Sequence, residues 1–336
     1  MTAPRTLNGQ TAYAERLLEL VAPKLELVEE ELRRNFHSKI ATIEDVGAHI
    51  LGGGGKRLRP ALLLLVSKML RYDDGYRDVV YAAVVEFIHT ATLIHDDIID
   101  EADVRRGRTS VNYGWGNNLT VLVGDYIFMH SMAMALADGN LEILRLLSDA
   151  TIKMIEGEIL GTELNGRVDL SVDDYFDIVG RKTAALFGAT CRIPGFFVDL
   201  PESSITALHT YGYNLGVCFQ LIDDLLDFTS STEVLGKPAL SDLKEGKVTL
   251  PLILAMPRAT ARERELIAAV AHTKSFNGTD PSEILAIVNR YDTLEETREI
   301  ARDYANRARK ALESFPASPA KEALEVALDF VLERDR

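Results

Sequence analysis

The sequence predicts an all-α protein, folded as one large domain over residues 1–336. Apolar residues recur at positions i, i+3, i+4 and i+7 over long stretches, with short Gly, Pro and Asn breaks between them. Strand-like alternation is nearly absent, and 47% of the residues are hydrophobic, which suffices for a large core. No internal repeat, low-complexity linker or sharp change of composition divides the chain.

The predicted helices follow one another along the chain. The first begins at Pro23, because proline suits the first helical turn, and runs through Leu32. The next helices cover, in order, residues 59–70, 78–100, 120–137, 141–160, 172–198 and 203–228. Ser171 and Asp174 fit a capping box at the start of the helix over 172–198. Helices continue beyond residue 250, with a break near Asn277 and Gly278.

Charge and composition exclude several classes of function. The net charge of −14 argues against a nucleic-acid partner, because a phosphate backbone demands a basic surface. Cys191 and Cys218 have no metal-like spacing, so we expect buried thiols in a reducing compartment. The N-terminus lacks the apolar segment of a signal peptide, and no uninterrupted apolar run reaches the roughly 18 residues of a membrane span. We therefore expect a cytoplasmic protein without a membrane anchor.

Two aspartate clusters carry most of the chemical information. The runs DDIID at 96–100 and DDLLD at 223–227 each end a long apolar stretch with helical spacing. Residues four apart share a helix face, and like charges there weaken a helix by a few tenths of a kcal/mol unless a cation offsets them. Mg²⁺ prefers carboxylate oxygens and is usually shared with substrate phosphates. The clusters therefore predict Mg²⁺ sites that clamp a diphosphate.

Cationic residues accompany the first cluster. Arg105, Arg106 and Arg108 follow it in a Gly-containing turn, and arginines suit fork-like binding of phosphate. Lys56 and Arg59 follow four glycines at a predicted helix start, where the helix N-terminus also attracts anions. For this glycine-rich run, an ordinary flexible loop is the alternative interpretation.

Other polar residues stand out against apolar surroundings. His89 precedes Asp96 by two helical turns and so shares its face, although a satisfied core histidine is the usual alternative. Lys182 lies mid-helix in an apolar stretch, where burial is costly without a partner; a surface lysine is the alternative. Gln220 precedes the second cluster by three residues.

The loop after residue 228 is long and carries Lys237 and Lys247. Loops of that length within a compact domain are usually functional or disordered. We expect these lysines to fold over a bound anion.

These motifs together resemble the trans-prenyltransferases, the head-to-tail polyprenyl diphosphate synthases. The resemblance runs from Gly55 to Pro251 and covers the family's motifs in order. The matching segments are GKRLRP, FIHTATLIHDDIIDEADVRRG, GDYIF, EGEILG, GRKTAALF, FQLIDDLLDFT and GKPALSDLKEGKVTLPL. One small departure is Gly161, where many relatives have Gln.

The resemblance implies a fold of antiparallel helices around a deep central cavity, usually as a homodimer. It implies Mg²⁺ bound by Asp96, Asp100 and Asp223. It assigns binding of the allylic diphosphate to Arg105, Lys182 and Lys237, with Lys247 nearby. It assigns binding of isopentenyl diphosphate to Lys56, Arg59, His89 and Arg106. Thr183 and Gln220, with Lys182, would face the developing allylic cation.

Product length depends on the residues one turn before the first cluster. Ala91 and Thr92 lie about 6–7.5 Å deeper along the helix, at 1.5 Å per residue. In relatives with short products, bulky aromatic residues close the cavity floor here, so the small residues predict an open floor. The next possible floor is Phe128 and Met132, for which ordinary core packing is the alternative. The wording HTATLIHDD resembles octaprenyl-class synthases of the quinone side-chain pathway, which implies a product of about C35–C50 and most often C40.

Other functions remain to be distinguished. The nearest alternative is a short-chain farnesyl or geranylgeranyl diphosphate synthase, and product chromatography separates the two. A non-catalytic regulatory subunit of a heteromeric synthase would be expected to lose an aspartate cluster or a diphosphate-binding arginine. A terpene cyclase would usually lack the second cluster and the GKRLRP segment. A purely structural helical scaffold would not explain the shared face of His89, Asp96 and Asp100.

Overall fold

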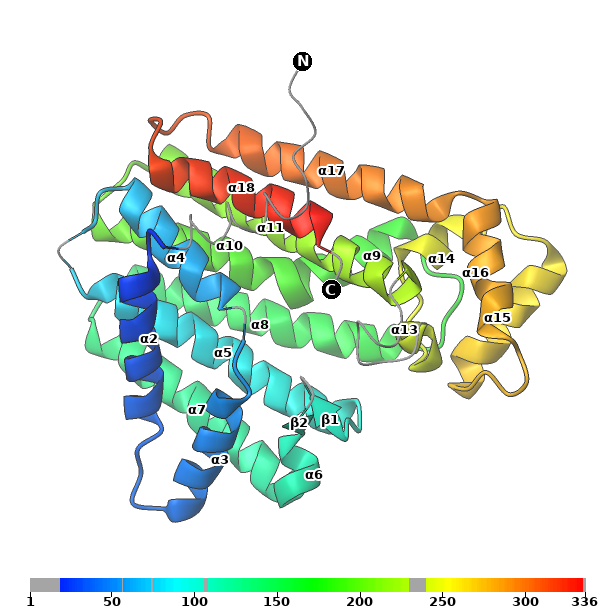
Figure 1. The fold of residues 1–336 in the computed structure, drawn as a ribbon, viewed down its shortest axis with the longest axis horizontal. Coiled ribbons are helices and arrows are strands. Elements are labelled where there is room, and N and C mark those ends of the chain that lie inside the picture. Colours follow the sequence, from blue (N-terminus) through cyan, green and yellow to red (C-terminus); the bar gives the residue numbers. More distant parts are fainter. Residues whose placement is uncertain (1–18, 56, 74, 106–107, 230–239, 335–336) are drawn as a thin grey trace. The chain divides into compact units, whose positions relative to one another are not determined.

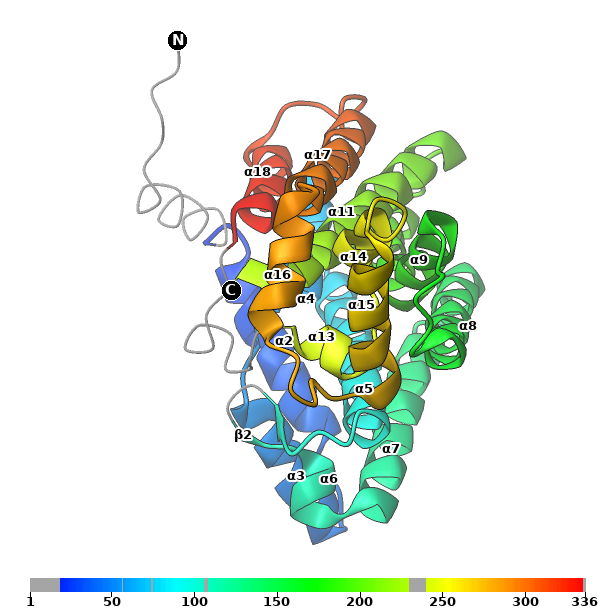
Figure 2. The ribbon, with the colours of Figure 1, turned by 90° about the vertical axis from the view of Figure 1, so that its right-hand side faces the viewer.

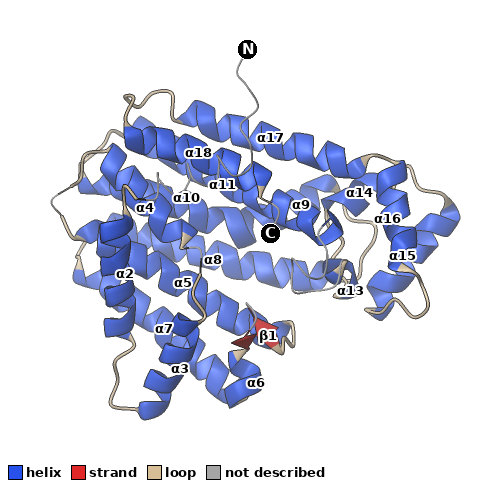
Figure 3. Ribbon diagram, in the orientation of Figure 1, coloured by secondary structure: helices blue, strands red, loops and turns tan. Residues whose placement is uncertain are grey.

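The computed structural model describes residues 19–55, 57–73, 75–105, 108–229 and 240–334. Helices dominate this part of the chain, which confirms the predicted all-α class (Figure 3). Its only strands are β1 (Val104–Arg105) and β2 (Arg108–Thr109), which pair as one short antiparallel hairpin.

The chain falls into two compact units that interleave along the sequence. The first unit contains the described residues among 1–149, 189–209 and 312–327, and the second contains those among 150–188, 210–311 and 328–336. The division falls inside four helices, which are α8 (Leu141–Leu164), α10 (Ala185–Arg192), α11 (Glu202–Thr229) and α18 (Pro319–Glu333). The assignment of residues 1–336 to one domain stays a prediction.

The first unit is built around one long helix, α5 (Arg77–Ile99). Its other elements are α2 (Ala22–Asn35), α3 (Ala41–Gly52), α4 (Leu58–Met69), the hairpin, α6 (Val111–Trp115), α7 (Asn117–Ala137) and the 3₁₀-helix η2 (Ile193–Phe197). Helix α5 packs against α7, α4 and α2 (Figure 1). Its Phe87 ring meets Phe36 edge-on, with 5.4 Å between the ring centroids. All residues from Ala61 to Val66 of α4 are buried, as expected of a helix that is apolar on every face.

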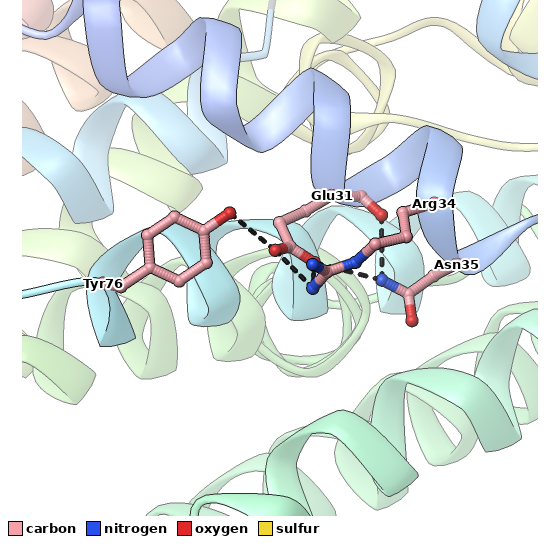
Figure 4. A network of polar contacts seen from close by, with 4 residues as sticks. All are labelled: Glu31, Arg34, Asn35 and Tyr76. Atoms are coloured by element: carbon pink, nitrogen blue, oxygen red, sulfur yellow. Dashed lines mark hydrogen bonds and ion pairs between the residues drawn. The ribbon is translucent and has the colours of Figure 1, made fainter.

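A buried carboxylate ties α2 to the start of α5 (Figure 4). Glu31 is 2% exposed, and both its carboxylate oxygens accept from Arg34 Nη2 at 2.6 Å. Tyr76, the N-cap of α5, donates its hydroxyl to Glu31 Oε1 at 2.6 Å, and Asn35 Nδ2 donates to Oε2. Burial and this bond raise the pKa of Tyr76 to about 12. A buried charge is tolerated only when it is paired in this way.

The second unit contains shorter helices. They are α9 (Val172–Val179), the π-helix η1 (Gly180–Ala184), α13 (Ser241–Lys244), α14 (Leu250–Ala255), α15 (Ala261–Thr273), α16 (Pro281–Arg290) and α17 (Thr293–Ala311). Helix α16 contacts both α14 and α15 (Figure 2). The predicted break at Asn277 and Gly278 is confirmed, since both residues adopt positive φ between α15 and α16.

The helix predicted over 172–198 is divided into α9, η1, α10 and η2. Its predicted start is confirmed, because Ser171 Oγ accepts from Asp174 N and Asp174 Oδ2 accepts from Ser171 N. The π-helix lies where α8 approaches closely: a Cβ on Gly157 would lie 2.6 Å from Lys182 N. Hydrophobic periodicity does not register the extra residue that a π-turn contains.

Both cysteines are buried free thiols, as predicted. Burial raises the pKa of Cys218 to about 12 and that of Cys191 further. Helices α5 and α7 are long and apolar enough to cross a membrane by length and composition alone. A buried core helix meets the same criterion, and 67% of the apolar window of α5 is buried, against 33% of that of α7.

Candidate active site

The first aspartate cluster closes α5. Asp96 lies in the last turn and Asp100 is the C-cap, whose N–H donates to the Asp96 carbonyl at 2.8 Å. Asp97 faces another side, is 3% exposed, and accepts from Arg105 Nε. No basic residue lies in the last turn of α5. Carboxylates are unfavourable at the negative end of a helix dipole, so this cluster needs cations from elsewhere.

The cations predicted beside this cluster come from the hairpin and from α4. Arg105 belongs to β1, and Arg59 lies half-buried in the first turn of α4. His89 is half-buried on α5, two turns before Asp96. Lys56 and Arg106 lie outside the described residues.

Arg57 sets the direction in which α4 begins. It adopts a left-handed conformation with φ of 46° at the N-cap, which costs roughly 1–2 kcal/mol for a residue with a side chain. Its guanidinium is held between Glu29 Oε1 at 2.5 Å and Glu86 Oε1 at 2.7 Å. These ion pairs hold the strained turn in place between the glycine run and Arg59.

The second cluster lies in the last two turns of α11, again without a basic residue in the last turn. Asp223 is exposed and pairs with Arg334, whose guanidinium also lies 4.1 Å from the centroid of the Phe219 ring. Asp227 is buried and accepts from Ser241 Oγ at 2.7 Å and from the Ser241 and Asp242 N–H groups at 3.0 and 3.2 Å.

Burial crowds negative charge at this helix end. Burial and, to a smaller extent, the charges of Asp223 and Asp227 raise the pKa of Asp224 to about 7, against hydrogen bonds from Tyr175 and Gln220 that lower it. Burial likewise raises the pKa of Asp227 and of Asp242, where the neighbouring carboxylates add to the effect. A cation bound here would relieve this repulsion.

Thr183 and Gln220 lie in contact, although 37 residues separate them. Thr183 Oγ1 donates to Gln220 Oε1 at 2.9 Å, and Gln220 Nε2 donates to Asp224 Oδ1 at 2.8 Å. Tyr175 donates its hydroxyl to Asp224 Oδ2 at 2.5 Å. Because the Thr183 proton is used on Gln220, its oxygen keeps its lone pairs as acceptors.

Lys182 pairs with Glu158 of α8 and is half-buried, which supplies the partner that a lysine in this apolar stretch requires. Lys182 and Thr183 both belong to the π-helix η1, and π-turns are frequent at functional sites. Lys247 Nζ lies 2.8 Å from Glu245 Oε2. Lys237 lies outside the described residues.

The residues predicted to limit product length all belong to the first unit. Ala91 is 2% exposed, and Thr92 is half-buried with its hydroxyl donating to the His89 carbonyl at 2.8 Å. Phe128 and Met132 are half-buried, one turn apart on α7.

Within the described ranges, no group of three or more His, Cys, Asp or Glu side chains lies close enough to hold a metal ion unaided. This fits Mg²⁺, which commonly uses one or two carboxylates and completes its shell with water and substrate phosphates.

The structure adds residues that sequence patterns did not single out. Glu158 and Arg334 contact the predicted residues Lys182 and Asp223 from 24 and 111 positions away along the chain, and Tyr175 contacts Asp224 from 49 positions away. The structure also adds Asp224, which the sequence could have indicated because it lies inside the second aspartate cluster.

The sequence and the fold both match known proteins over most of the chain. Residues 40–288 match the family described as polyprenyl synthetase. The octaprenyl diphosphate synthase of Escherichia coli K12 is 37% identical over 96% of this chain and 99% of its own length. A decaprenyl diphosphate synthase structure from Rhodobacter capsulatus is 37% identical with a TM-score of 0.90, covering 96% of this chain and 99% of that one. A polyprenyl synthase of Caulobacter crescentus, solved with calcium and isoprenyl diphosphate, is 35% identical with a TM-score of 0.91, covering 96% and 98%.

A helical fold with two carboxylate-ended helices and cationic side chains beside them defines a prenyltransferase of the isoprenoid synthase fold. The chain belongs to the polyprenyl synthetase family. Its similarity to octaprenyl and decaprenyl diphosphate synthases supports the function of a long-chain polyprenyl diphosphate synthase for this chain.

Proposed function

We propose that this enzyme condenses isopentenyl diphosphate head-to-tail onto an allylic diphosphate and makes a trans-polyprenyl diphosphate, most often octaprenyl. The observation that carries the proposal is that α5 and α11 both end in aspartates with no basic residue in the last turn. Such ends are electrostatically unfavourable in the free protein and become favourable around cations that accompany a diphosphate.

Asp96, Asp100 and Asp223 are the proposed metal ligands. Mg²⁺ is the proposed ion, and when bound it neutralises the charge that develops on the departing diphosphate. The Caulobacter relative was solved with both calcium and isoprenyl diphosphate, which supports a divalent cation in this family. Asp223 must exchange Arg334 for the ion, whereas Asp227 stays engaged by Ser241 and serves to hold the helix end.

Two sets of cationic side chains are proposed, one for each substrate. Arg105, Lys182 and Lys237, with Lys247 nearby, are proposed to bind the allylic diphosphate. Lys56, Arg59, His89 and Arg106 are proposed to bind isopentenyl diphosphate. Lys182 pairs with Glu158 in the free protein and is proposed to exchange this partner for a phosphate.

Thr183 and Gln220 are proposed to face the allylic carbon as its bond to oxygen breaks. Their mutual hydrogen bond fixes the Thr183 hydroxyl with its lone pairs available, and oriented dipoles stabilise a developing cation without reorganising. The double bond of isopentenyl diphosphate then attacks this carbon and a proton is lost, for which the released diphosphate is the proposed base.

We propose that the active form is a homodimer joined through α7. Leu122, Met129 and Leu136 are 63%, 62% and 59% exposed and recur every seven residues, which is the spacing of a helix–helix seam. A matching stripe on a second copy would bury it. We propose a cytoplasmic location for this dimer.

The function is tested by mixing purified enzyme with Mg²⁺, isopentenyl diphosphate and farnesyl diphosphate and measuring released diphosphate. We expect turnover by the wild type and a loss of about 10²-fold or more in Asp96→Asn and in Asp223→Asn. Asp149→Asn, at an exposed position on α8, is the matched control and should retain full turnover. An active Asp96→Asn enzyme, or an inactive wild type, would contradict the proposal.

A further inference from the structure

The β1–β2 hairpin carries Arg105 yet has little apolar packing to hold it. Each strand has two residues, Val104 is 58% exposed, and both residues of β2 are exposed. A pocket lined by His49, Ile94, Arg105 and Arg108 lies between the hairpin, α3 and α5. A hairpin this short is marginal by itself, so polar contacts must fix its position.

The pairing of the hairpin makes external anchors necessary. Arg105 lies directly opposite Arg108, and Val104 lies opposite Thr109. Like charges directly opposite each other on paired strands are destabilising. Arg105 forms an ion pair with Asp97, which offsets its repulsion from Arg108. Arg108 therefore needs an acceptor of its own.

One residue of α3 supplies both anchors of β2. His49 Nε2 donates to the Thr109 carbonyl at 2.8 Å, and the His49 carbonyl accepts from Arg108 Nη1 at 3.1 Å. This carbonyl is among the last four of α3, which lack partners within the helix, and a cation there also suits the helix dipole. Gly52 leaves room for the contact, since a Cβ there would lie 2.7 Å from Arg108 Nη1.

We propose that His49 is a positioning residue that, with Arg108, holds β2 and so fixes Arg105 beside the carboxylates of α5. The proposal rests on the proposed role of Arg105 in binding the allylic diphosphate. The His49 ring also meets Trp115 of α6 edge-on, with 5.0 Å between the ring centroids. His49 acts on the substrate through the hairpin, so we expect it to set the affinity for that substrate and to leave the chemical step unchanged.

The test compares wild type, His49→Ala, His49→Gln and His37→Ala. The glutamine can still donate to the Thr109 carbonyl, and His37 is an exposed histidine before α3 that serves as the matched control. In His49→Ala we expect the KM for farnesyl diphosphate to rise roughly 10- to 100-fold, because a misplaced binding group weakens the complex, while kcat changes little. His49→Gln should restore most of the affinity, and His37→Ala should match the wild type.

Hydrogen exchange of residues 101–110 is measured on the same proteins without substrate. We expect faster exchange of the Ser110 amide, which donates to the Asp103 carbonyl across the hairpin, in His49→Ala. Unchanged exchange or an unchanged KM in folded His49→Ala would overturn the proposal. If His49→Ala does not fold, Arg108→Gln carries the same two measurements. Because exchange needs no turnover, an inactive wild type would count against the proposed function alone.

Discussion

Thr183 and Gln220 come from separate helices and form a chain of hydrogen bonds that ends at Asp224. Thr183 is 9% exposed, and its hydroxyl donates to the Gln220 side-chain oxygen, while the Gln220 amide nitrogen donates to Asp224. The amide is thereby oriented with its oxygen toward Thr183 and its nitrogen toward the carboxylate. This order assigns distinct roles to the two residues, with Thr183 as the dipole and Gln220 as its support.

Replacing Thr183 by valine tests this assignment. Valine keeps the shape and removes the hydroxyl, so we expect kcat to fall on the order of 10²-fold because one preorganised dipole is lost. Stability should fall only by about 1 kcal/mol, the usual value of one hydrogen bond. Steady-state kinetics and thermal unfolding measure the two effects. Thr162→Val is the control, since that exposed hydroxyl donates only to the Glu158 carbonyl, and a full-rate Thr183→Val enzyme would refute the role.

Ala91 tests the proposed cavity floor. We expect Ala91→Phe to shorten the product sharply, because an aromatic ring one turn below Asp96 would block elongation. Ala91 is 2% exposed, and overpacking a core site costs typically 1–3 kcal/mol, so unfolding is measured alongside product size. Thr92→Phe is the second variant, at a half-buried position. If both folded variants keep the wild-type product length, the floor lies elsewhere.

At the scale of elements, buried polar links determine where helices begin. Glu31 connects α2 to Tyr76 at the start of α5 (Figure 4). We expect Glu31→Ala to lower the free energy of unfolding by about 2 kcal/mol, because hydrogen bonds to a charged group are lost together. Urea denaturation measures this change. Glu30→Ala, one position along α2 and exposed, is the control, and equal stability of Glu31→Ala and the wild type would contradict the account.

Helices with a strong period of 3.6 could be predicted from the sequence to within a few residues. The helix expected over 78–100 is α5 (Arg77–Ile99), and that expected over 203–228 is α11 (Glu202–Thr229). The π-helix could not be predicted, because it depends on the close approach of Gly157 from α8. The short hairpin also escaped detection, since two-residue strands leave no alternation to recognise.

Part of the candidate site could likewise be predicted from the sequence, and part could not. The aspartate clusters and their cations stand close together in the sequence, so their motif is readable. The Tyr175–Asp224 and Arg334–Asp223 contacts join residues 49 and 111 positions apart, and only the fold brings them together. Partners of this kind carry no local pattern from which they could be predicted.

At the scale of the whole molecule, the exposed stripe on α7 predicts self-association. Met129→Glu places a charge on a 62% exposed apolar position, so we expect it to dissociate the proposed dimer without unfolding the protomer. Sedimentation velocity measures the assembly. Ile40→Glu, at a 60% exposed apolar position before α3, is the control. A monomeric wild type, or one that binds lipid vesicles through α7, would contradict the dimer.

The central claim is tested most directly by the size of the product. Purified enzyme is incubated with Mg²⁺, isopentenyl diphosphate and farnesyl diphosphate, and the products are separated by chromatography, with a parallel sample containing a chelator. We predict a ladder that ends near C40, the octaprenyl length of the Escherichia coli relative, and no product with the chelator. A product that stops at C15–C20 would contradict the open floor at Ala91 and Thr92. No condensation with any allylic diphosphate would contradict the account of this protein as a polyprenyl diphosphate synthase.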